Sequence, residues 1–506
     1  MDINNIESQR QTLQAELDKS KAQEDRNIMG QFSTPIGLAT NILTHAKNIF
    51  PKQSKIRFLD PAFGTGSFFS ALNIVFPLSR IEAAIGYEID EHYGKPASRL
   101  WEKTCLNYKL EDFTKQQPPG EDEKYNLIIC NPPYVRHHHI NGQKGSLQTQ
   151  ALAAANMNLS GLAGLYCYFM ALAHPWMKNN GIAGWLIQSE FMDVNYGQAV
   201  KDYLLNEVTL LQIHRFDPND VQFDDALVSS AVVWFKNTRP NKTHQVKFTY
   251  GGTIDRPAHE KDVSLTSLAT EKKWTRFPLF DERVENNAPR LSDFFVVKRG
   301  IATGDNKFFV LTRKRIEDLG LPLEQFRPIL PSPRYLDVIE VNADKEGFPN
   351  IKTQLFVLDC KLPLDEVKKS FPQLHGYLEE GVRSGVSERY LCKSRKIWYS
   401  QENRPDSRFY CTYIGRSDKE DKKPFRFILN RSKAIVANSY LILYPKPYLE
   451  KEIDRNPELC ERLLKALNQI TGKAMLDEGR VYGGGMHKME PKELANVPAR
   501  EISAIF

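Results

Sequence analysis

The residues best suited to chemistry are the tetrapeptide Asn131-Pro132-Pro133-Tyr134, which follows an apolar run at 125–130. Two prolines fix the backbone and remove two N–H donors. The Asn131 side-chain oxygen and the Pro132 carbonyl are left as a rigid pair of acceptors. An aromatic amine is a poor nucleophile because its lone pair is delocalised, and two acceptors holding its hydrogens would localise that pair without a strong base. The tetrapeptide predicts group transfer to such an amine, with Tyr134 stacked on its ring. A plain strand-ending turn is the alternative.

A glycine turn, Asp60-Pro61-Ala62-Phe63-Gly64-Thr65-Gly66, begins 71 residues before the tetrapeptide and follows another apolar run. Glycine lets a ligand approach the backbone closely, and the start of the following helix favours a carboxylate or phosphate. The third glycine of a dinucleotide fingerprint is missing, since Phe69 stands in its place. Alone, the turn is weak support for a nucleotide.

Acidic residues near the ends of the next expected strands strengthen the case. Glu88 lies 22 residues after Gly66, where a carboxylate accepts hydrogen bonds from ribose hydroxyls. Asp112 can accept from an adenine amino group, and Phe113 can cover the adenine face. Each alone would more often be a surface carboxylate or a core aromatic. Together they predict a nucleoside with a carboxylate or phosphate tail.

The elements that position these residues alternate between short apolar runs and helix-like stretches from 56 to 236. This alternation predicts an α/β domain with a mostly parallel sheet and helices on both faces. The last two runs, VTLLQIHRF and LVSSAVVWF, have no room for a helix between them and should form an antiparallel edge. We expect an N-terminal helix at 1–28, a catalytic domain at 29–245, a linker at 246–290, and an α+β domain at 291–506.

Composition narrows the class of protein. No run of 18 apolar residues exists, and the polar N-terminus does not resemble a signal peptide. Seven scattered cysteines without a CxxC pair favour reduced thiols in the cytoplasm and no metal site. Residues 291–506 carry 37 Lys and Arg against 30 Asp and Glu, an excess of +7, while residues 1–290 carry −1. Basic residues interleaved with aromatics fit a polyanionic partner, although an ordinary solvated surface is the alternative.

In these motifs and their order, the chain resembles the S-adenosylmethionine-dependent amino-methyltransferases. It looks most like the gamma-class DNA adenine-N6 methyltransferases, the group of the TaqI enzyme. The resemblance implies a Rossmann-like cofactor domain followed by a DNA target-recognition domain. It also implies Asn131, Pro132, Pro133 and Tyr134 as the catalytic loop. The implied cofactor contacts are Thr34, Pro35, Asp60, Pro61, Ala62, Gly64, Gly66, Glu88, Asp112 and Phe113.

Other positions carry weaker expectations. Phe223 resembles the aromatic that packs on the second face of the flipped base. Arg136 is a candidate phosphate contact beside the catalytic loop. Near the C-terminus, the segment YGGGMHKMEPKEL resembles one found late in gamma-class chains. We expect its Gly483, Gly484, Gly485 and Lys488 to contact DNA, a flexible turn being the alternative.

The expected function is methylation of adenine N6 in double-stranded DNA, after the base leaves the helix so that Tyr134 can stack on it. The expected partner is a restriction endonuclease whose cleavage the modification blocks, and a monomer should suffice. N4-cytosine methylation uses the same geometry. Related chemistry serves methylation of RNA and of protein glutamine, so these stay open. About 30 residues precede the cofactor domain, too few for a fused nuclease. The intact tetrapeptide argues against a non-catalytic relic.

Overall fold

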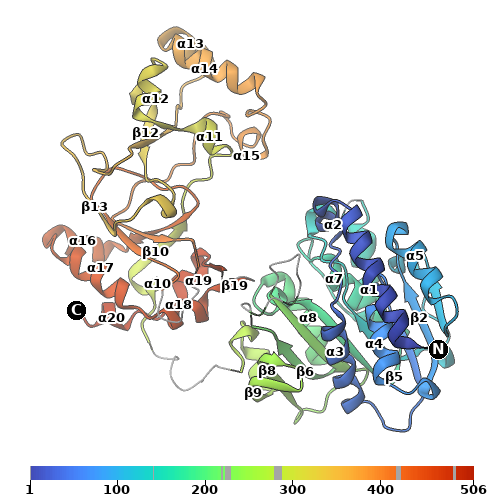
Figure 1. Ribbon diagram of the computed structural model, residues 1–506. Coiled ribbons are helices and arrows are strands. Elements are labelled where there is room, and N and C mark those ends of the chain that lie inside the picture. Colours follow the sequence, from blue (N-terminus) through green and yellow to red (C-terminus); the bar gives the residue numbers. More distant parts are fainter. Residues whose placement is uncertain are drawn as a thin grey trace. The chain divides into compact units, whose positions relative to one another are not determined.

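The computed structural model describes the whole chain except residues 1, 141, 218–219, 221, 223–228, 279–287, 417–422 and 483–485. The chain divides into two compact units, one formed mainly by residues 1–280 and the other mainly by 281–506 (Figure 1). Each unit has hydrophobic cores of its own.

The N-terminal unit is built on a nine-stranded sheet of order β3-β2-β1-β4-β5-β7-β6-β8-β9. Its five strands from β3 to β5 pair in parallel, as βαβ connections require. The strands are β1 (Ile56–Asp60), β2 (Ile81–Tyr87), β3 (Leu106–Lys109), β4 (Tyr125–Cys130), β5 (Met177–Gln188), β6 (Thr209–Arg215), β7 (Ser230–Lys236), β8 (Gln245–Thr253) and β9 (Arg256–Ser264).

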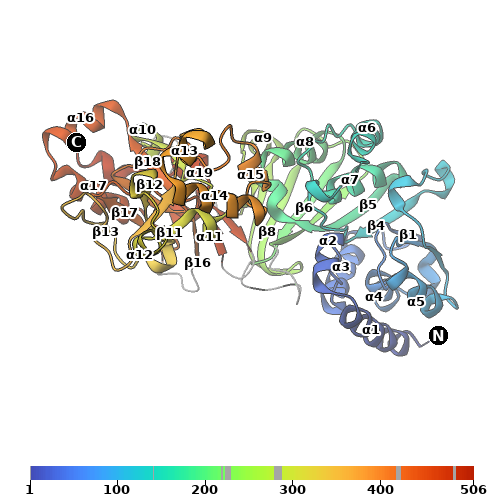
Figure 2. The same ribbon diagram turned by 90° about the horizontal axis from the view of Figure 1, so that it is seen from above.

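Helices cover both faces of this sheet (Figure 2). They are α1 (Ile3–Ser20), α2 (Gln23–Met29), α3 (Ile36–Ile49), α4 (Ser67–Val75), α5 (Glu91–Trp101), α6 (Lys144–Ala155), α7 (Leu165–Ala173), α8 (Gln198–Asn206) and α9 (Leu265–Thr270). Successive side chains of a strand point to opposite faces. Accordingly, Phe58 packs into the core beneath α3, α4 and α5, whereas Leu59 packs into the core beneath α6, α7 and α8.

The far half of the sheet differs from expectation. The antiparallel pairing predicted for the last two runs is confirmed between β6 and β7. These strands do not end the sheet, because β8 pairs with β6 and β9 pairs with β8. The predicted linker at 246–290 is therefore corrected: its first part forms strands and a helix. Most of β9 is exposed to solvent, so it lacks the apolar alternation that marks a half-buried strand.

The C-terminal unit is α+β, as expected, with a five-stranded sheet of order β10-β18-β15-β17-β13 and two three-stranded sheets, β11-β14-β12 and β16-β20-β19. Its strands are β10 (Phe295–Arg299), β11 (Val310–Thr312), β12 (Phe326–Ile329), β13 (Glu340–Val341), β14 (Leu355–Leu358), β15 (Phe409–Thr412), β16 (Ile414–Arg416), β17 (Phe427–Asn430), β18 (Tyr440–Pro445), β19 (Arg480–Tyr482) and β20 (Met486–Lys488).

Helices flank these small sheets. They are α10 (Leu291–Phe294), α11 (Asn306–Phe309), α12 (Arg313–Asp318), α13 (Leu364–Ser370), α14 (Pro372–Arg383), α15 (Tyr390–Lys393), α16 (Pro447–Arg455), α17 (Leu459–Gln469), α18 (Gly472–Glu478), α19 (Pro491–Asn496) and α20 (Arg500–Ser503). Among the described residues of either unit, no helix is long and apolar enough to cross a membrane.

Candidate active site

The two predicted loops leave neighbouring parallel strands at the point where the strand order reverses. The glycine turn follows β1 and the Asn131 tetrapeptide follows β4, and these strands pair through Phe58–Leu127 and Leu59–Ile128. In open α/β sheets, ligands bind in the crevice outside the carboxyl ends of the strands at this reversal. A cavity of about 460 Å³ lies there. The predicted residues on its wall are Thr34, Asp60, Pro61, Ala62, Gly64, Glu88, Asp112, Phe113, Asn131 and Pro133.

The Asn131 amide is held in one orientation. Its Nδ2 donates to the Phe32 carbonyl oxygen (3.0 Å) and to Thr34 Oγ1 (3.1 Å). A carbonyl only accepts hydrogen bonds, so the amide nitrogen must face Phe32, and the oxygen faces away. That oxygen, Oδ1, is buried and has no hydrogen-bond partner among the described residues. A buried acceptor without a partner is costly, so this atom is a strong candidate to receive a ligand's N–H group.

Residues 30–34 pack against the loop that holds the tetrapeptide. The Gly30 carbonyl accepts a hydrogen bond from the Tyr134 backbone N–H (3.0 Å). A Cβ on Gly30 would lie 2.4 Å from that nitrogen, and Gly30 has φ +64°, so only glycine fits. The Phe32 and Tyr134 rings lie 5.8 Å apart. Tyr134 is 5% exposed, donates its hydroxyl to the Leu186 carbonyl (3.1 Å) and does not line the cavity.

The glycine turn uses two left-handed residues, Gly64 (φ +56°) and Gly66 (φ +95°). A Cβ on Gly64 would meet no atom within 4 Å, so this glycine opens onto the cavity and leaves room for a ligand against the backbone. A Cβ on Gly66 would lie 2.6 Å from the Trp101 indole nitrogen. Gly64 therefore borders the ligand space, whereas Gly66 allows close packing behind the loop.

Two carboxylates flank this turn: Asp60, which is buried, and Glu88, which is half-buried. Glu88 accepts backbone N–H bonds from Gly64 (2.9 Å) and Asp90 (2.8 Å), which fix its position on the wall. Burial raises the pKa of Glu88, although these N–H bonds oppose the rise. Burial also raises the pKa of Asp60 to about 8; the N–H bond from Ala62 opposes this rise and the charge of Glu88 adds to it. A cationic or hydrogen-bond-donating ligand would favour the charged forms of both groups.

Asp112 and Phe113 lie together on the cavity wall at the start of a 3₁₀ turn, Phe113–Lys115. Asp112 Oδ1 accepts from the Thr114 backbone N–H (3.0 Å) and hydroxyl (2.7 Å). Phe113 is 3% exposed and packs against Tyr87, Phe169 and Trp176. The side chain that was expected to cover an adenine is therefore also part of the core.

The remaining predicted residues are placed as follows. Pro35, Gly66 and Pro132 belong to the same loops but are not on the cavity wall. Arg136 is exposed and begins the turn His137–His139. Lys488, in the C-terminal unit, forms an ion pair with Glu490 (2.9 Å) and lies over the Tyr413 ring. Phe223, Gly483, Gly484 and Gly485 lie outside the described residues.

Sequence reasoning missed a third contribution to the wall, which comes from α1 and the residues after it. Gln14 and Asp18 of α1 line the cavity beside the glycine turn. Tyr93 of α5 donates its hydroxyl to Asp18 (2.8 Å). Polar residues on a weakly amphipathic helix give no hint of a site, because they look like an ordinary solvated face.

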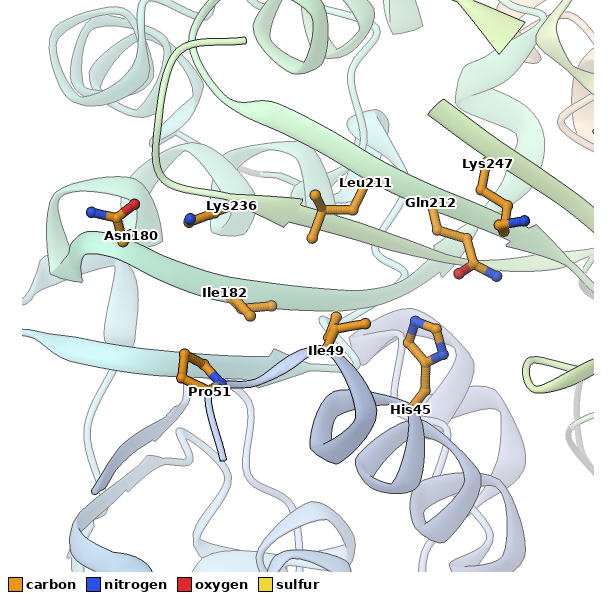
Figure 3. A pocket seen from close by; sticks show the side chains of 9 residues that line it. All are labelled: His45, Ile49, Pro51, Asn180, Ile182, Leu211, Gln212, Lys236 and Lys247. Atoms are coloured by element: carbon orange, nitrogen blue, oxygen red, sulfur yellow. The ribbon is translucent and has the colours of Figure 1, made fainter. Parts of the chain in front are cut away.

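A second hollow, of about 530 Å³, lies between α3 and the other end of the sheet (Figure 3). Its wall includes His45 from α3, Asn180 and Ile182 near the start of β5, and Lys247 near the start of β8. None of the predicted site residues lines it. Since ligands of open α/β sheets bind at the carboxyl ends of the strands, we assign the active site to the first cavity.

Two family models match this sequence. The model described as Eco57I restriction-modification methylase matches residues 79–222, which include the tetrapeptide. The model described as the C-terminal domain of type II methyltransferase M.Eco57I matches residues 272–505. The two matches fall largely on different structural units, the first on the sheet that carries the cavity and the second on the α+β unit.

Similar proteins agree with these matches. Type II methyltransferase M.AccI of Acinetobacter calcoaceticus is 26% identical over 502 residues, which cover 96% of this chain and 87% of that protein. M.XamI of Xanthomonas campestris pv. amaranthicola is 26% identical over 483 residues, or 92% and 84% of the two chains. The type IIL restriction-modification enzyme MmeI, solved in complex with DNA, has a similar fold, with a TM-score of 0.55, 14% identity, and coverage of 96% of this chain and 76% of that one.

Proposed function

We propose that this chain, which belongs to the type II restriction–modification methylases, methylates the exocyclic N6 of adenine in DNA. Its cofactor is S-adenosylmethionine, which supplies an electrophilic methyl group when bound. The observation that carries the proposal is the Oδ1 of Asn131, which is buried and has no partner among the described residues. The Nδ2 of the same amide donates two hydrogen bonds, which hold this oxygen in place. An acceptor in this state fits an amino group, which brings two N–H donors.

The chain's own residues then act on the nucleophile. Asn131 Oδ1 accepts one N6 hydrogen and the Pro132 carbonyl accepts the other, so the nitrogen lone pair turns away from the ring system. Because Oδ1 is already positioned, little reorganisation is needed when charge develops on the nitrogen. No general base is required, since the N6 proton becomes acidic as the new bond forms and can leave to solvent.

The cavity fits the cofactor. It is large enough for a nucleoside with an amino-acid tail, and open space in front of Gly64 lets that tail reach the backbone. We assign the ribose hydroxyls to Glu88 and the adenine of the cofactor to Asp112 and Phe113. The remaining contacts on the wall are assigned to the tail end of the site: Thr34, Asp60, Pro61, Ala62 and Gly64. Pro35 and Gly66, which are not on the wall, shape the same two loops from behind.

Target binding requires a change at Tyr134. Stacking on a flipped base needs an open ring face, yet only 5% of Tyr134 is exposed. The side chains that cover its ring must therefore move when the base enters, and extrusion of the base costs a few kcal/mol more. We assign the second face of the base to Phe223.

We also propose how the chain binds DNA, in what form and where it acts, and with which enzyme it is paired. The C-terminal unit, with its basic excess, holds and reads double-stranded DNA, and Arg136, Lys488 and Gly483–Gly485 are candidate backbone contacts. The enzyme acts as a monomer in the cytoplasm, and its modification blocks a cognate restriction endonuclease.

Modification-sensitive long-read sequencing tests the function. DNA from a methylation-free host that expresses this chain is compared with DNA from a host expressing Asn131→Ala. N6-methyladenine at one short motif, absent with the variant, is the expected result. N4-methylcytosine at that motif would show that the methylated base is cytosine and not adenine. Unmodified DNA despite folded protein would overturn DNA as the substrate and direct the search to RNA and protein.

A further inference from the structure

One residue of the glycine turn, Thr65, is held in place by contacts with residues outside the turn. Thr65 stands between two left-handed glycines, which leave the loop backbone many alternatives. Yet Thr65 is only 2% exposed, and its carbonyl accepts a hydrogen bond from the Trp101 indole N–H (2.8 Å). Its hydroxyl is held separately, and both partners of that hydroxyl come from α1.

The first partner belongs to a buried ion pair on α1. Arg10 and Glu7 are 3% and 6% exposed, unusual for charged residues of a surface helix. Arg10 donates from Nε and Nη2 to the two oxygens of Glu7, both at 2.8 Å. The remaining nitrogen, Nη1, donates to Thr65 Oγ1 at 3.0 Å. The pair therefore aims one guanidinium nitrogen at the glycine turn.

The second partner is Gln14, one turn further along the helix. The Thr65 hydroxyl gives its only proton to Gln14 Oε1 (2.6 Å), so it faces α1. Gln14 Nε2 in turn donates to both oxygens of Asp18 (3.0 Å each). Gln14 and Asp18 both line the cavity that we assign to the cofactor. One face of α1 thus hydrogen-bonds to the glycine turn and, further along, forms part of the wall of the same cavity.

We propose that α1 is a positioning element for cofactor binding and that Arg10 is its positioning residue. Arg10 fixes Thr65 through the hydroxyl, and Thr65 sets the backbone path between Gly64 and Gly66 that the cofactor's amino-acid tail contacts. A flexible glycine loop is thereby ordered before the cofactor arrives, which lowers the entropic cost of binding. The inference rests on the assignment of the cavity to S-adenosylmethionine.

A purely structural role for the ion pair makes a different prediction. In that case the pair would affect stability alone, and its replacement by apolar residues of similar volume would leave ligand affinity unchanged. A single replacement of Arg10 by an apolar residue is uninformative, because it leaves the Glu7 carboxylate buried without a cation. The informative variants remove both charges together, or remove only the Thr65 hydroxyl.

The test is a double-mutant cycle on the full chain, with binding of S-adenosylhomocysteine measured by calorimetry. Thr65→Val removes the hydroxyl at nearly constant shape, and Thr65→Ser keeps it. The Glu7→Leu/Arg10→Met double variant removes the pair. Lys19→Met, an exposed cation at the end of α1, is the matched control. Arg10→Lys serves in place of the double variant if that protein does not fold.

We expect Thr65→Val and the Glu7→Leu/Arg10→Met variant each to raise the dissociation constant about tenfold, the loss of one positioning hydrogen bond. Thr65→Ser and Lys19→Met should stay within about twofold of wild type. Adding Thr65→Val to the pair variant should cost no more than about twofold, because both changes break one contact. Full additivity, or unchanged affinity in Thr65→Val, would overturn the role of Arg10. A wild-type protein that binds no S-adenosylhomocysteine would overturn the cofactor site itself.

Discussion

The glycine turn and the tetrapeptide that we propose to be catalytic leave adjacent strands of one sheet, yet their polar groups are arranged in opposite ways. The polar groups of the glycine turn already have partners: the N–H groups of Gly64 and Gly66 donate to Glu88 and Phe63, and the Thr65 hydroxyl bonds to α1. The tetrapeptide is rigid by virtue of two prolines and holds one buried acceptor, Asn131 Oδ1, that has no partner in the part of the chain described.

This difference separates affinity from reactivity. A loop whose polar groups already have partners can bind the cofactor by shape and by the remaining lone pairs of its carboxylates, without a large penalty when the site is open. The positioned Asn131 acceptor can hold the hydrogens of the reacting amine more tightly as positive charge develops on its nitrogen, and an interaction that strengthens in the transition state raises the rate. Changes in the first loop should therefore alter cofactor affinity, whereas changes at the second should alter the rate.

The largest expected effect comes from Asn131→Ala, which removes the buried Oδ1 acceptor. We expect the rate constant in single-turnover methylation to fall about 100- to 1000-fold, the usual cost of losing one preorganised hydrogen-bond partner of the transition state. Affinity for S-adenosylhomocysteine should stay within about twofold. A comparable loss of cofactor affinity would place Asn131 in the cofactor site. The glycine turn and the tetrapeptide would then not differ in function.

Glu88→Gln tests the loop whose polar groups already have partners. The amide cannot accept from both backbone N–H groups and also from the ribose, so the dissociation constant for S-adenosylhomocysteine should rise tenfold to about 100-fold. The rate at saturating cofactor should change far less. Glu91→Gln, an exposed neighbour on α5, is the control for loss of one negative charge. Equal effects in the two variants would contradict a specific role for Glu88.

The raised pKa of Asp60 predicts that the free energy of unfolding depends on pH. Burial raises its pKa to about 8, whereas an aspartate of the unfolded chain has a pKa of about 4. Between these values the folded protein holds a proton that the unfolded chain has released, so stability falls as pH rises. The slope from this group approaches about 1.4 kcal/mol per pH unit.

Urea denaturation between pH 6 and 7.5 checks that slope in cofactor-free protein. Asp60→Asn, which cannot ionise, should flatten it, and Asp122→Asn, on an exposed turn, should not. Parallel slopes for wild type and Asp60→Asn would show that Asp60 is already charged in the folded protein.

The smallest expected effect is that of Thr34→Val. It removes one of two acceptors for Asn131 Nδ2 and leaves the Phe32 carbonyl in place. The methylation rate should fall about fivefold, and Thr34→Ser should restore it. A change in cofactor affinity would support the tail contact that we assign to Thr34, and an unchanged rate would contradict its role in positioning Asn131.

Much of this site is readable from sequence because both loops have strong local signals. Prolines and glycines fix backbone geometry within a few residues, and apolar runs mark the parallel strands that bring the loops together. The pairing of β6 with β7 was predictable for the same reason, since too few residues separate them for a helix.

What sequence could not supply depends on contacts between distant segments. The bonds from Phe32 and Thr34 to Asn131 span 99 and 97 residues, and the bond from Arg10 to Thr65 spans 55. Nothing in the local composition of α1 distinguishes a buried Arg10 from a solvated one. Strand β9 escaped prediction because it is mostly exposed, and β8 because its buried residues Val246 and Phe248 form only a short apolar alternation that ends in two glycines.

The last strand of the sheet also bears on how the protein behaves at high concentration. β9 ends the nine-stranded sheet, and an edge strand is a template on which a second chain can polymerise. Here the edge carries Pro257, which lacks an N–H group, and the exposed charges of Glu260 and Asp262. Such an edge resists strand addition and protects the folded protein from aggregation through its largest sheet. The polar sequence that concealed β9 from prediction therefore also disfavours pairing of this edge with another chain.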